Sequence, residues 1–458
     1  MSPSRREFLA QAAGLATAVA GCAPRPEAAS RPNIVFILTD DQGYGDLACY
    51  GATDLKTPVI DRLAAEGVRF TQYYAAAPEC TPTRTAFMTG RYLHRVGGLE
   101  CAIGTTNVGR YDDAIRLAER HDLGLPVEET SIATLLDRAG YASAIYGKWH
   151  LGYEKKFLPL RHGFDHFVGI LGGHCDYFHH CEITGVKTLY ENDHPIERPD
   201  YMTDIITDES VKFIRRQSAA RPFFLYVAYT CPHSPYQGPQ DRKPEPVPRE
   251  LWNKGTREKY VEMVENLDQS IGKILDALDQ SGLAENTIVF FSSDNGATGP
   301  GSNAPFSGHK STLYEGGIRV PCIIRWPGVI PPGVVSHQPC ITMDLTVSIA
   351  SAAGVKPPRP FDGIDIVRHV ASRAPSFPRT LFWRARRGQR TWRAVRDGNM
   401  KYLSLTDGEK FTEWVFDLAA DPAEKNDLLK ARPAEARRLK ALLTDWERAV
   451  RHTRGRET

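Results

Sequence analysis

The sequence predicts an α/β fold, with a large, mostly parallel sheet layered between helices and a small C-terminal antiparallel sheet with a helix. Up to about residue 375, continuous apolar runs that suit strands buried on both faces alternate with amphipathic helical segments. Beyond that point the runs are short and separated by turn residues, as in antiparallel strands, and a charged helical segment follows.

The first part begins with a strand at residues 33–38 (NIVFIL) and then a helix with Thr57 as its cap and Pro58 at its first position. Apolar residues recur at intervals of three and four from residue 260 to 278, which is typical of a helix with one buried face. The other predicted strands are residues 142–146, 223–228, 287–292 and 319–325.

The second part is expected to form a small antiparallel sheet. Asp397-Gly398 is turn material between two of its strands, and a charged helix is expected at about residues 434–451. The change of pattern divides the mature chain into a main domain at residues 32–375 and a C-terminal subdomain at 376–458. The predicted strands of the subdomain are residues 379–383, 391–395 and 401–405.

Composition excludes several classes of protein. A chain that is 41% hydrophobic with 57 basic and 55 acidic side chains can bury a core, so disorder is excluded. A net charge of +2 provides no general basic field, so no nucleic-acid partner is expected. Nine cysteines in 458 residues are too few for a disulfide scaffold.

The N-terminus resembles an export signal. Residues 4–9 (SRREFL) form a twin-arginine pattern, and the Ala-rich stretch after it ends in Cys22 within a sequence similar to a lipobox. We therefore expect a signal at residues 1–21 that is read by the Tat export machinery, and a tether at residues 22–31. The protein would be periplasmic or at the cell surface, with a lipid on Cys22 as its membrane contact. The alternative is an amphipathic helix with an incidental cysteine.

Acidic residues follow two of the predicted strands directly. Asp40 and Asp41 come after the first strand, and Asp294-Asn295 comes after the strand at residues 287–292. The carboxyl ends of strands in an open α/β sheet are where ligands bind. Either motif alone is compatible with a simple turn, but together they supply three carboxylates and an amide oxygen, which suit Ca²⁺ or Mg²⁺.

Cys80 lies on a turn that enters a short helix, with Arg84 four residues later. A lone cysteine in this setting is either an activated nucleophile or a small buried hydrophobic residue. The residues alone do not decide between the two.

The motif Cys-x-Pro-x-Arg from Cys80 to Arg84, followed by Met-Thr-Gly-Arg, resembles the signature of the type I sulfatases. Thr83 departs from the pattern, because the family more often has serine there, but it keeps a hydroxyl. The resemblance implies an alkaline-phosphatase-like fold. Within the family, the sequence pattern is similar to that of the arylsulfatase and N-acetylgalactosamine-6-sulfatase branch. The resembling segments, in order, are residues 32–46, 80–91, 147–152, 231–233, 294–296 and 310–321.

The resemblance places the reaction at Cys80. It implies that a formylglycine-generating enzyme oxidises Cys80 to Cα-formylglycine, whose hydrated form has two hydroxyl groups. One hydroxyl, made acidic by the metal, attacks sulfur, and the second expels sulfate, which explains why the cysteine is oxidised. The implied metal ligands, with Ca²⁺ expected and Mg²⁺ as the alternative, are Asp40, Asp41, residue 80, Asp294 and Asn295.

Five further residues receive roles from the resemblance. Lys148 and Lys310 would neutralise the sulfate oxygens, and His233 or Lys310 would protonate the leaving alcohol. His150 would deprotonate the second hydroxyl, and Arg84 would support the formylglycine and the carboxylates.

Two other segments bear on the substrate. Residues 173–181 (GHCDYFHHC) permit a zinc site, ordinary loop packing, or a loop similar to one near the substrate pocket of sulfatases, and the roles of His174, His179 and His180 stay open. An arginine run follows in the subdomain, which is typical of a solvated face but could also attract a polyanionic glycan. The run comprises Arg384, Arg386, Arg387, Arg390, Arg393 and Arg396.

The leading hypothesis is a metal-dependent sulfuric ester hydrolase acting on a sulfated carbohydrate or aryl sulfate. A second hypothesis is a phosphonate or phosphate diester hydrolase of the same superfamily. A third is a lipoprotein that binds sulfated glycan without catalysis and whose Cys80 is never oxidised. Proton-transfer residues argue against the third, because a binding protein has no use for them.

Overall fold

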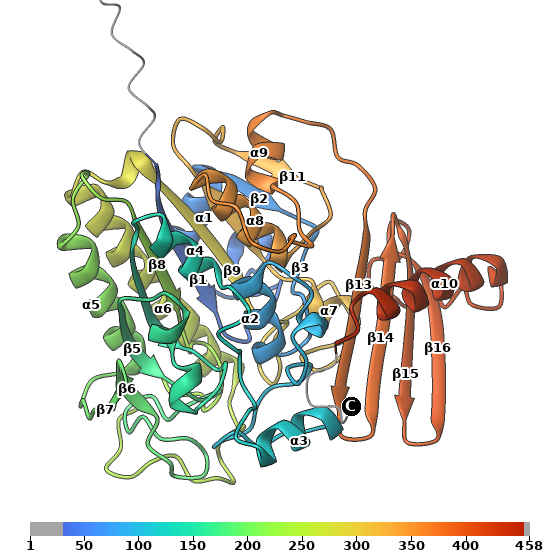
Figure 1. The fold of residues 1–458 in the computed structure, drawn as a ribbon, viewed down its shortest axis with the longest axis horizontal. Coiled ribbons are helices and arrows are strands. Elements are labelled where there is room, and N and C mark those ends of the chain that lie inside the picture. Colours follow the sequence, from blue (N-terminus) through green and yellow to red (C-terminus); the bar gives the residue numbers. More distant parts are fainter. Residues whose placement is uncertain (1–30, 453–458) are drawn as a thin grey trace, which may run out of the picture. The chain divides into compact units, whose positions relative to one another are not determined.

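The computed structural model describes residues 31–452 (Figure 1). The predicted signal, the lipid site at Cys22 and the tether up to Ser30 lie outside the described residues. From Arg31 onward the chain groups into one unit. No helix within residues 31–452 is long and apolar enough to cross a membrane.

A ten-stranded mixed sheet forms the centre of the fold, as the sequence predicts (Figure 1). Its five middle strands are parallel and lie in the order β9, β1, β8, β4, β5, while the neighbours β10 and β6 run antiparallel to them. The middle strands are β9 (Thr287–Ser293), β1 (Asn33–Thr39), β8 (Phe223–Ala228), β4 (Ala142–Lys148) and β5 (His166–Ile170). The outer strands are β10 (Cys322–Arg325), β2 (Val68–Phe70), β11 (Val334–Ser336), β6 (Leu189–Glu191) and β7 (His194–Pro195).

Helices cover both faces of this sheet because side chains of a strand alternate between its faces. Phe36 of β1 packs on Phe87 with ring centroids 4.2 Å apart, whereas Val35 and Ile37 belong to the core on the other face. The first face carries α2 (Cys80–Thr89), α4 (Ile132–Arg138), α8 (Thr342–Ala352) and α9 (Ile366–Ala371). The second carries α1 (Pro58–Ala65), α5 (Met202–Arg215) and α6 (Arg257–Gln280).

A four-stranded antiparallel meander follows, and it packs on the main sheet region through a shared hydrophobic cluster. Trp383 of the meander is fully buried and donates a hydrogen bond to Ala75 O at 2.9 Å. The meander comprises β13 (Thr380–Arg387), β14 (Arg390–Asp397), β15 (Met400–Asp407) and β16 (Lys410–Asp417), with α10 (Pro433–Ala449) packed against it. The remaining strands and α-helices are β3 (Tyr73–Tyr74), β12 (Cys340–Ile341), α3 (Asp112–Glu119) and α7 (Glu315–Ile318).

Two local predictions were wrong, and one strand of the meander was not predicted. β10 begins at Cys322, not at residue 319, because α7 ends at Ile318 and Pro321 has no N–H for a sheet hydrogen bond. The Thr57 side chain does not cap α1, since its hydroxyl accepts from Ala48 N at 3.0 Å instead. β16 was missed, because charged residues interrupt its apolar pattern.

Candidate active site

The register of the central strands brings the predicted carboxylates together. β1 and β9 pair in parallel with Thr39 opposite Ser293, so the residues that follow the two strands meet at one edge of the sheet. The backbone N–H of Asp41 donates to Asp294 Oδ1 at 3.2 Å. One possible ligand atom from each of Asp40, Asp41, Cys80 and Asp294 lies within 4.8 Å of the others, and all four residues are buried.

The cluster fits a divalent cation with oxygen ligands. Asn295 donates through Nδ2 to Asp41 Oδ1 at 2.7 Å, but its own Oδ1 is buried without a hydrogen-bond partner. Burial, opposed by Lys148, raises the pKa of Asp40 to about 7. Buried carboxylates and an orphaned amide oxygen are stabilised together by a hard cation such as Ca²⁺ or Mg²⁺.

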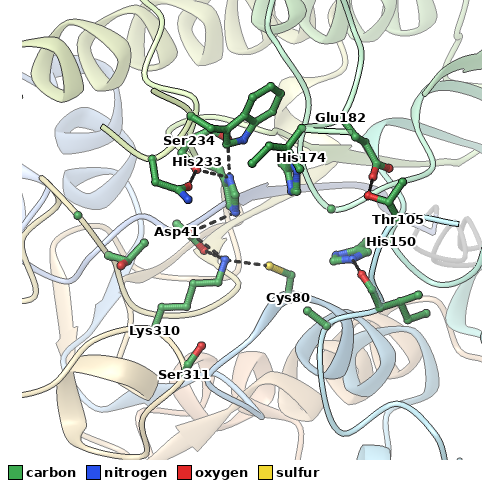
Figure 2. Close-up of a pocket in the computed structure, with 18 of the residues that line it drawn as sticks. Asp41, Cys80, Thr105, His150, His174, Glu182, His233, Ser234, Lys310 and Ser311 are labelled. Atoms are coloured by element: carbon green, nitrogen blue, oxygen red, sulfur yellow. Dashed lines mark hydrogen bonds and ion pairs between the residues drawn. The ribbon is translucent and has the colours of Figure 1, made fainter. Parts of the chain in front are cut away.

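Cys80 is the first residue of α2, a helix that is buried along its whole length. Its Sγ lies 3.6 Å from Asp40 Oδ1. It also lies 3.4 Å from Lys310 Nζ (Figure 2). Burial, opposed by the nearby lysines, raises the pKa of the Cys80 thiol to about 12. An unmodified Cys80 is therefore a neutral thiol at pH 7, which is a poor nucleophile.

Two lysines flank the cysteine and the carboxylates. Lys148 is completely buried and contacts Asp40 Oδ2 at 2.7 Å. Lys310 contacts Asp41 Oδ1 at 2.7 Å and Oδ2 at 2.9 Å. A buried and a partly buried cation beside Cys80 can neutralise an anionic group held there.

Arg84 lies one helical turn after Cys80 and is fully buried. Its guanidinium donates to Asp294 Oδ2 at 2.9 Å and to Lys148 O at 3.0 Å. It therefore orients a carboxylate of the cluster and the end of β4, where Lys148 is located.

The two predicted histidines lie on different sides of the cavity (Figure 2). His150 Nε2 lies 2.8 Å from Ile103 O and must carry the proton, because a carbonyl only accepts. His150 Nδ1 is buried without a partner, and burial with the charge of Lys148 holds the pKa of this imidazole well below its usual value. His233 Nε2 lies 3.5 Å from Asp41 Oδ2, and burial lowers its pKa to about 4.

These residues meet at a pocket of about 600 Å³, within the range of roughly 300–1,000 Å³ usual for small-ligand sites. The predicted residues that line it are Asp41, Cys80, His150, His233 and Lys310. The others are buried behind them, namely Asp40, Arg84, Lys148, Asp294 and Asn295. The lining also contains residues that were not predicted, because none of them belongs to a recognisable motif, namely Thr105, Arg110, Glu182, Trp252 and Asn253.

The 173–181 loop contributes to the pocket rather than to a zinc site. Gly173 and His174 line the pocket, and the His174 ring stacks on His233 with centroids 5.7 Å apart (Figure 2). His179 contacts Asp176, and His180 contacts a backbone carbonyl. Within residues 31–452, the grouping able to hold a metal is the carboxylate and cysteine cluster, so zinc in this loop finds no support.

The arginine run is a solvated face only in part, because Arg387 and Arg390 are exposed whereas Arg384 and Arg396 are largely or fully buried. Arg384 forms ion pairs with Glu100 and Glu447, and Arg396 is buried against Tyr74. The acidic partners are remote in sequence, so composition could not reveal them. Arg386, Arg387, Arg390 and Arg393 also form ion pairs, and Arg387 lines the pocket.

Comparison with known proteins decides the family. The Sulfatase family matches residues 32–355, and the C-terminal family of N-sulphoglucosamine sulphohydrolase matches residues 308–449. The chain belongs to the sulfatase family. Members of this family are sulfuric ester hydrolases, so the resemblance found in the sequence is confirmed.

Individual relatives of this sulfatase include two curated enzymes. N-acetylgalactosamine-6-sulfatase of Canis lupus familiaris is 39% identical over 376 residues, covering 78% of this chain and 67% of the relative. Steryl-sulfatase of Homo sapiens is 30% identical, with 93% and 88% covered. The crystal structure of Ps i-CgsB in complex with k-i-k-neocarrahexaose superposes with a TM-score of 0.77 at 28% identity, covering 91% of this chain and 93% of that one.

Proposed function

We propose that this sulfatase hydrolyses a sulfate ester on a sulfated carbohydrate, with residue 80 as formylglycine and a divalent cation, Ca²⁺ in preference to Mg²⁺. The observation that carries the proposal is the position of Cys80, within 3.6 Å of Asp40 and 3.4 Å of Lys310 at a pocket wall. Its burial as a neutral thiol argues against direct attack by sulfur, and so favours oxidation by a formylglycine-generating enzyme.

The cation would be held by Asp40, Asp41, Asp294 and Asn295 next to residue 80. When bound, it would stabilise negative charge on oxygen and, with formylglycine, supply a strong oxygen nucleophile at neutral pH. Arg84 holds Asp294 in place for this purpose through its 2.9 Å ion pair.

The remaining chemistry falls to the side chains around the cavity. Lys148 and Lys310 bind the sulfate oxygens and neutralise their charge. Lys310, or His233 when its imidazole is protonated, donates a proton to the departing alcohol oxygen. His150 accepts a proton at Nδ1, the atom that its bond to Ile103 leaves free.

A carbohydrate substrate is supported by the pocket and by the relatives. The lining combines aromatic rings of Tyr236 and Trp252 with polar groups such as Asn253, as a site for a polar ring requires. Relatives at 37–40% identity are N-acetylgalactosamine-6-sulfatases. We therefore propose sulfated amino sugars as first candidates, and aryl sulfates as artificial substrates.

The location of the protein is also a proposal. The twin-arginine pattern and Cys22 support Tat export to the periplasm or cell surface, with membrane contact through a lipid on Cys22 alone.

The function is tested by measuring, with one preparation, the turnover of three substrates. These are an aryl sulfate, an aryl phosphonate and N-acetylgalactosamine 6-sulfate. We expect the sulfate esters to be hydrolysed with much the higher kcat/KM. A preference for the phosphonate would replace the proposal with the phosphonate hydrolase hypothesis. Binding of sulfated sugar without turnover, by a calcium-loaded preparation that keeps Cys80 as a thiol even when coexpressed with a formylglycine-generating enzyme, would favour the binding-protein hypothesis.

A further inference from the structure

Two arginines from distant parts of the chain line the pocket together with Cys80 and Lys310. Arg110 follows a narrow hairpin in which Gly104 bridges Val108, and Arg387 ends β13 in the C-terminal meander. The N–H of Gly388 donates to Arg110 O at 2.6 Å. This bond fastens the turn that carries Arg387 to the segment that carries Arg110, so both belong to one wall.

The guanidinium of Arg110 has no acidic partner among residues 31–452. Its Nε is buried and has no hydrogen-bond acceptor. Arg386 of β13 differs from Arg110 in this respect, since it forms ion pairs with Asp112 and Asp113. A half-buried cation that lacks an acceptor beside a ligand cavity is most simply explained by an acceptor that the ligand brings.

Arg387 is only partly engaged. One terminal nitrogen, Nη1, donates to Glu79 Oε1 at 3.1 Å, and the side chain is 46% exposed. In the described residues Glu79 is its hydrogen-bond partner, and the other donors of the guanidinium remain available. Glu79 directly precedes Cys80, so this ion pair also fixes the distance between Arg387 and the reaction centre.

Glu182, an acidic residue that also lines the pocket, does not neutralise Arg110 or Arg387. Glu182 accepts hydrogen bonds from Tyr153 and Thr105, and it forms no ion pair with a residue in 31–452. Burial raises the pKa of its carboxyl to about 7, so its negative charge is reduced near neutral pH. The wall therefore presents net positive charge in addition to the lysines that serve the scissile sulfate.

We infer that Arg110 and Arg387 form a subsite for a second anionic group of the substrate, separate from the sulfate ester that is cleaved. The natural substrate is then a saccharide with at least two anionic groups, the second being another sulfate or a uronate carboxylate. Both groups match the planar donor fork of arginine. This inference rests on the proposed function, because it names the substrate class of the same site.

The test compares three substrates with a common scissile bond. N-acetylgalactosamine 6-sulfate provides one anion, its 4,6-disulfate adds a sulfate, and a uronate-linked disaccharide of the 6-sulfate adds a carboxylate. The quantity measured is the ratio of kcat/KM for each dianionic substrate to kcat/KM for the monoanionic one. This ratio does not depend on the active fraction of a preparation, so partial misfolding of a variant cannot imitate the effect.

We expect the wild type to favour at least one dianionic substrate by about tenfold or more, the usual size of one charge-assisted hydrogen bond. Arg110→Gln and Arg387→Gln should each reduce that ratio about tenfold, and Arg110→Lys should reduce it less. The matched control is Arg138→Gln, which changes an exposed arginine on α4 and should preserve the ratio. The dianionic substrate with the higher kcat/KM identifies the second anion as sulfate or carboxylate.

Ratios within twofold of wild type in both glutamine variants would overturn the subsite. Equal turnover of monoanionic and dianionic sugars by the wild type would also overturn it, while leaving the proposed function intact. Failure of the wild type, with modified residue 80 and calcium, to hydrolyse any sulfate ester would instead overturn the proposed function.

Discussion

Replacing Glu182 by glutamine is expected to stabilise the protein at alkaline pH and to have little effect near pH 4. Glu182 is 1% exposed and accepts a hydrogen bond from Tyr153 Oη at 2.6 Å and another from Thr105. No basic side chain among residues 31–452 forms an ion pair with it. Burial therefore raises the pKa of its carboxyl from 4.5 to about 7.

The sign and size of the effect follow from linkage. Because the folded state holds this proton more tightly than the unfolded chain, its stability contribution is complete below pH 4.5 and is lost as pH rises through 7. With these two pKa values the wild type should lose about 2.5 kcal/mol between pH 5 and pH 8 from this group. Glutamine resembles the protonated carboxyl and cannot ionise, so the Glu182→Gln variant avoids that loss.

Urea unfolding of the wild type and Glu182→Gln at pH 5 and pH 8, with equal calcium, measures the difference. The free energy of unfolding of the variant, relative to that of the wild type, should be about 2.5 kcal/mol larger at pH 8 than at pH 5. Glu285→Gln is the control, because Glu285 is exposed. The difference in free energy of unfolding between this variant and the wild type should be the same at both pH values. An advantage of Glu182→Gln that does not change with pH would refute the reasoning.

Three further predictions concern the metal, the meander and the membrane. Asp294→Asn should lower turnover about a hundredfold or more and reduce bound calcium measured by elemental analysis, because it removes one charged ligand; unchanged calcium content and turnover would contradict the assigned ligand. Lys401→Met should lower the free energy of unfolding by about 3–5 kcal/mol in denaturant titrations, because it strips the cation from two buried carboxylates. The same change at exposed Lys410 is the control, and equal effects would refute the argument. Cys22→Ala should move the protein from the membrane fraction to the soluble fraction with unchanged specific activity; retention in membranes after a high-salt wash would contradict lipidation.

The carboxylate cluster could be expected from the sequence, because the positions of its residues follow from the strand pattern and from the rule that ligand sites lie at the carboxyl ends of parallel strands. Two apolar runs identify β1 and β9, and parallel neighbours place Asp40, Asp41, Asp294 and Asn295 at one edge. The family resemblance supplied the lysines and histidines, and the structure places them around the same cavity. Their catalytic roles stay predictions.

The pocket wall that carries Arg110 and Arg387 could not be predicted in this way. Arg387 reaches the pocket only because the meander packs beside α2, and its contact with Glu79 joins residues 308 positions apart. The expectation of a solvated arginine face was wrong for Arg384 for the same reason, since its partners Glu100 and Glu447 are distant from it along the chain. Long-range packing, which periodicity does not encode, determines which charges meet.

The proposed function requires Cys80 to act as formylglycine, and peptide mass and turnover measured on one preparation test this requirement most directly. Coexpression with a formylglycine-generating enzyme should give a residue 80 peptide with an aldehyde in place of the thiol, and multiple turnovers of sulfate ester. Cys80→Ser should show at most a single slow turnover, because serine has no second hydroxyl with which to release sulfate. Multiple turnover by a preparation in which residue 80 is entirely thiol would contradict this requirement.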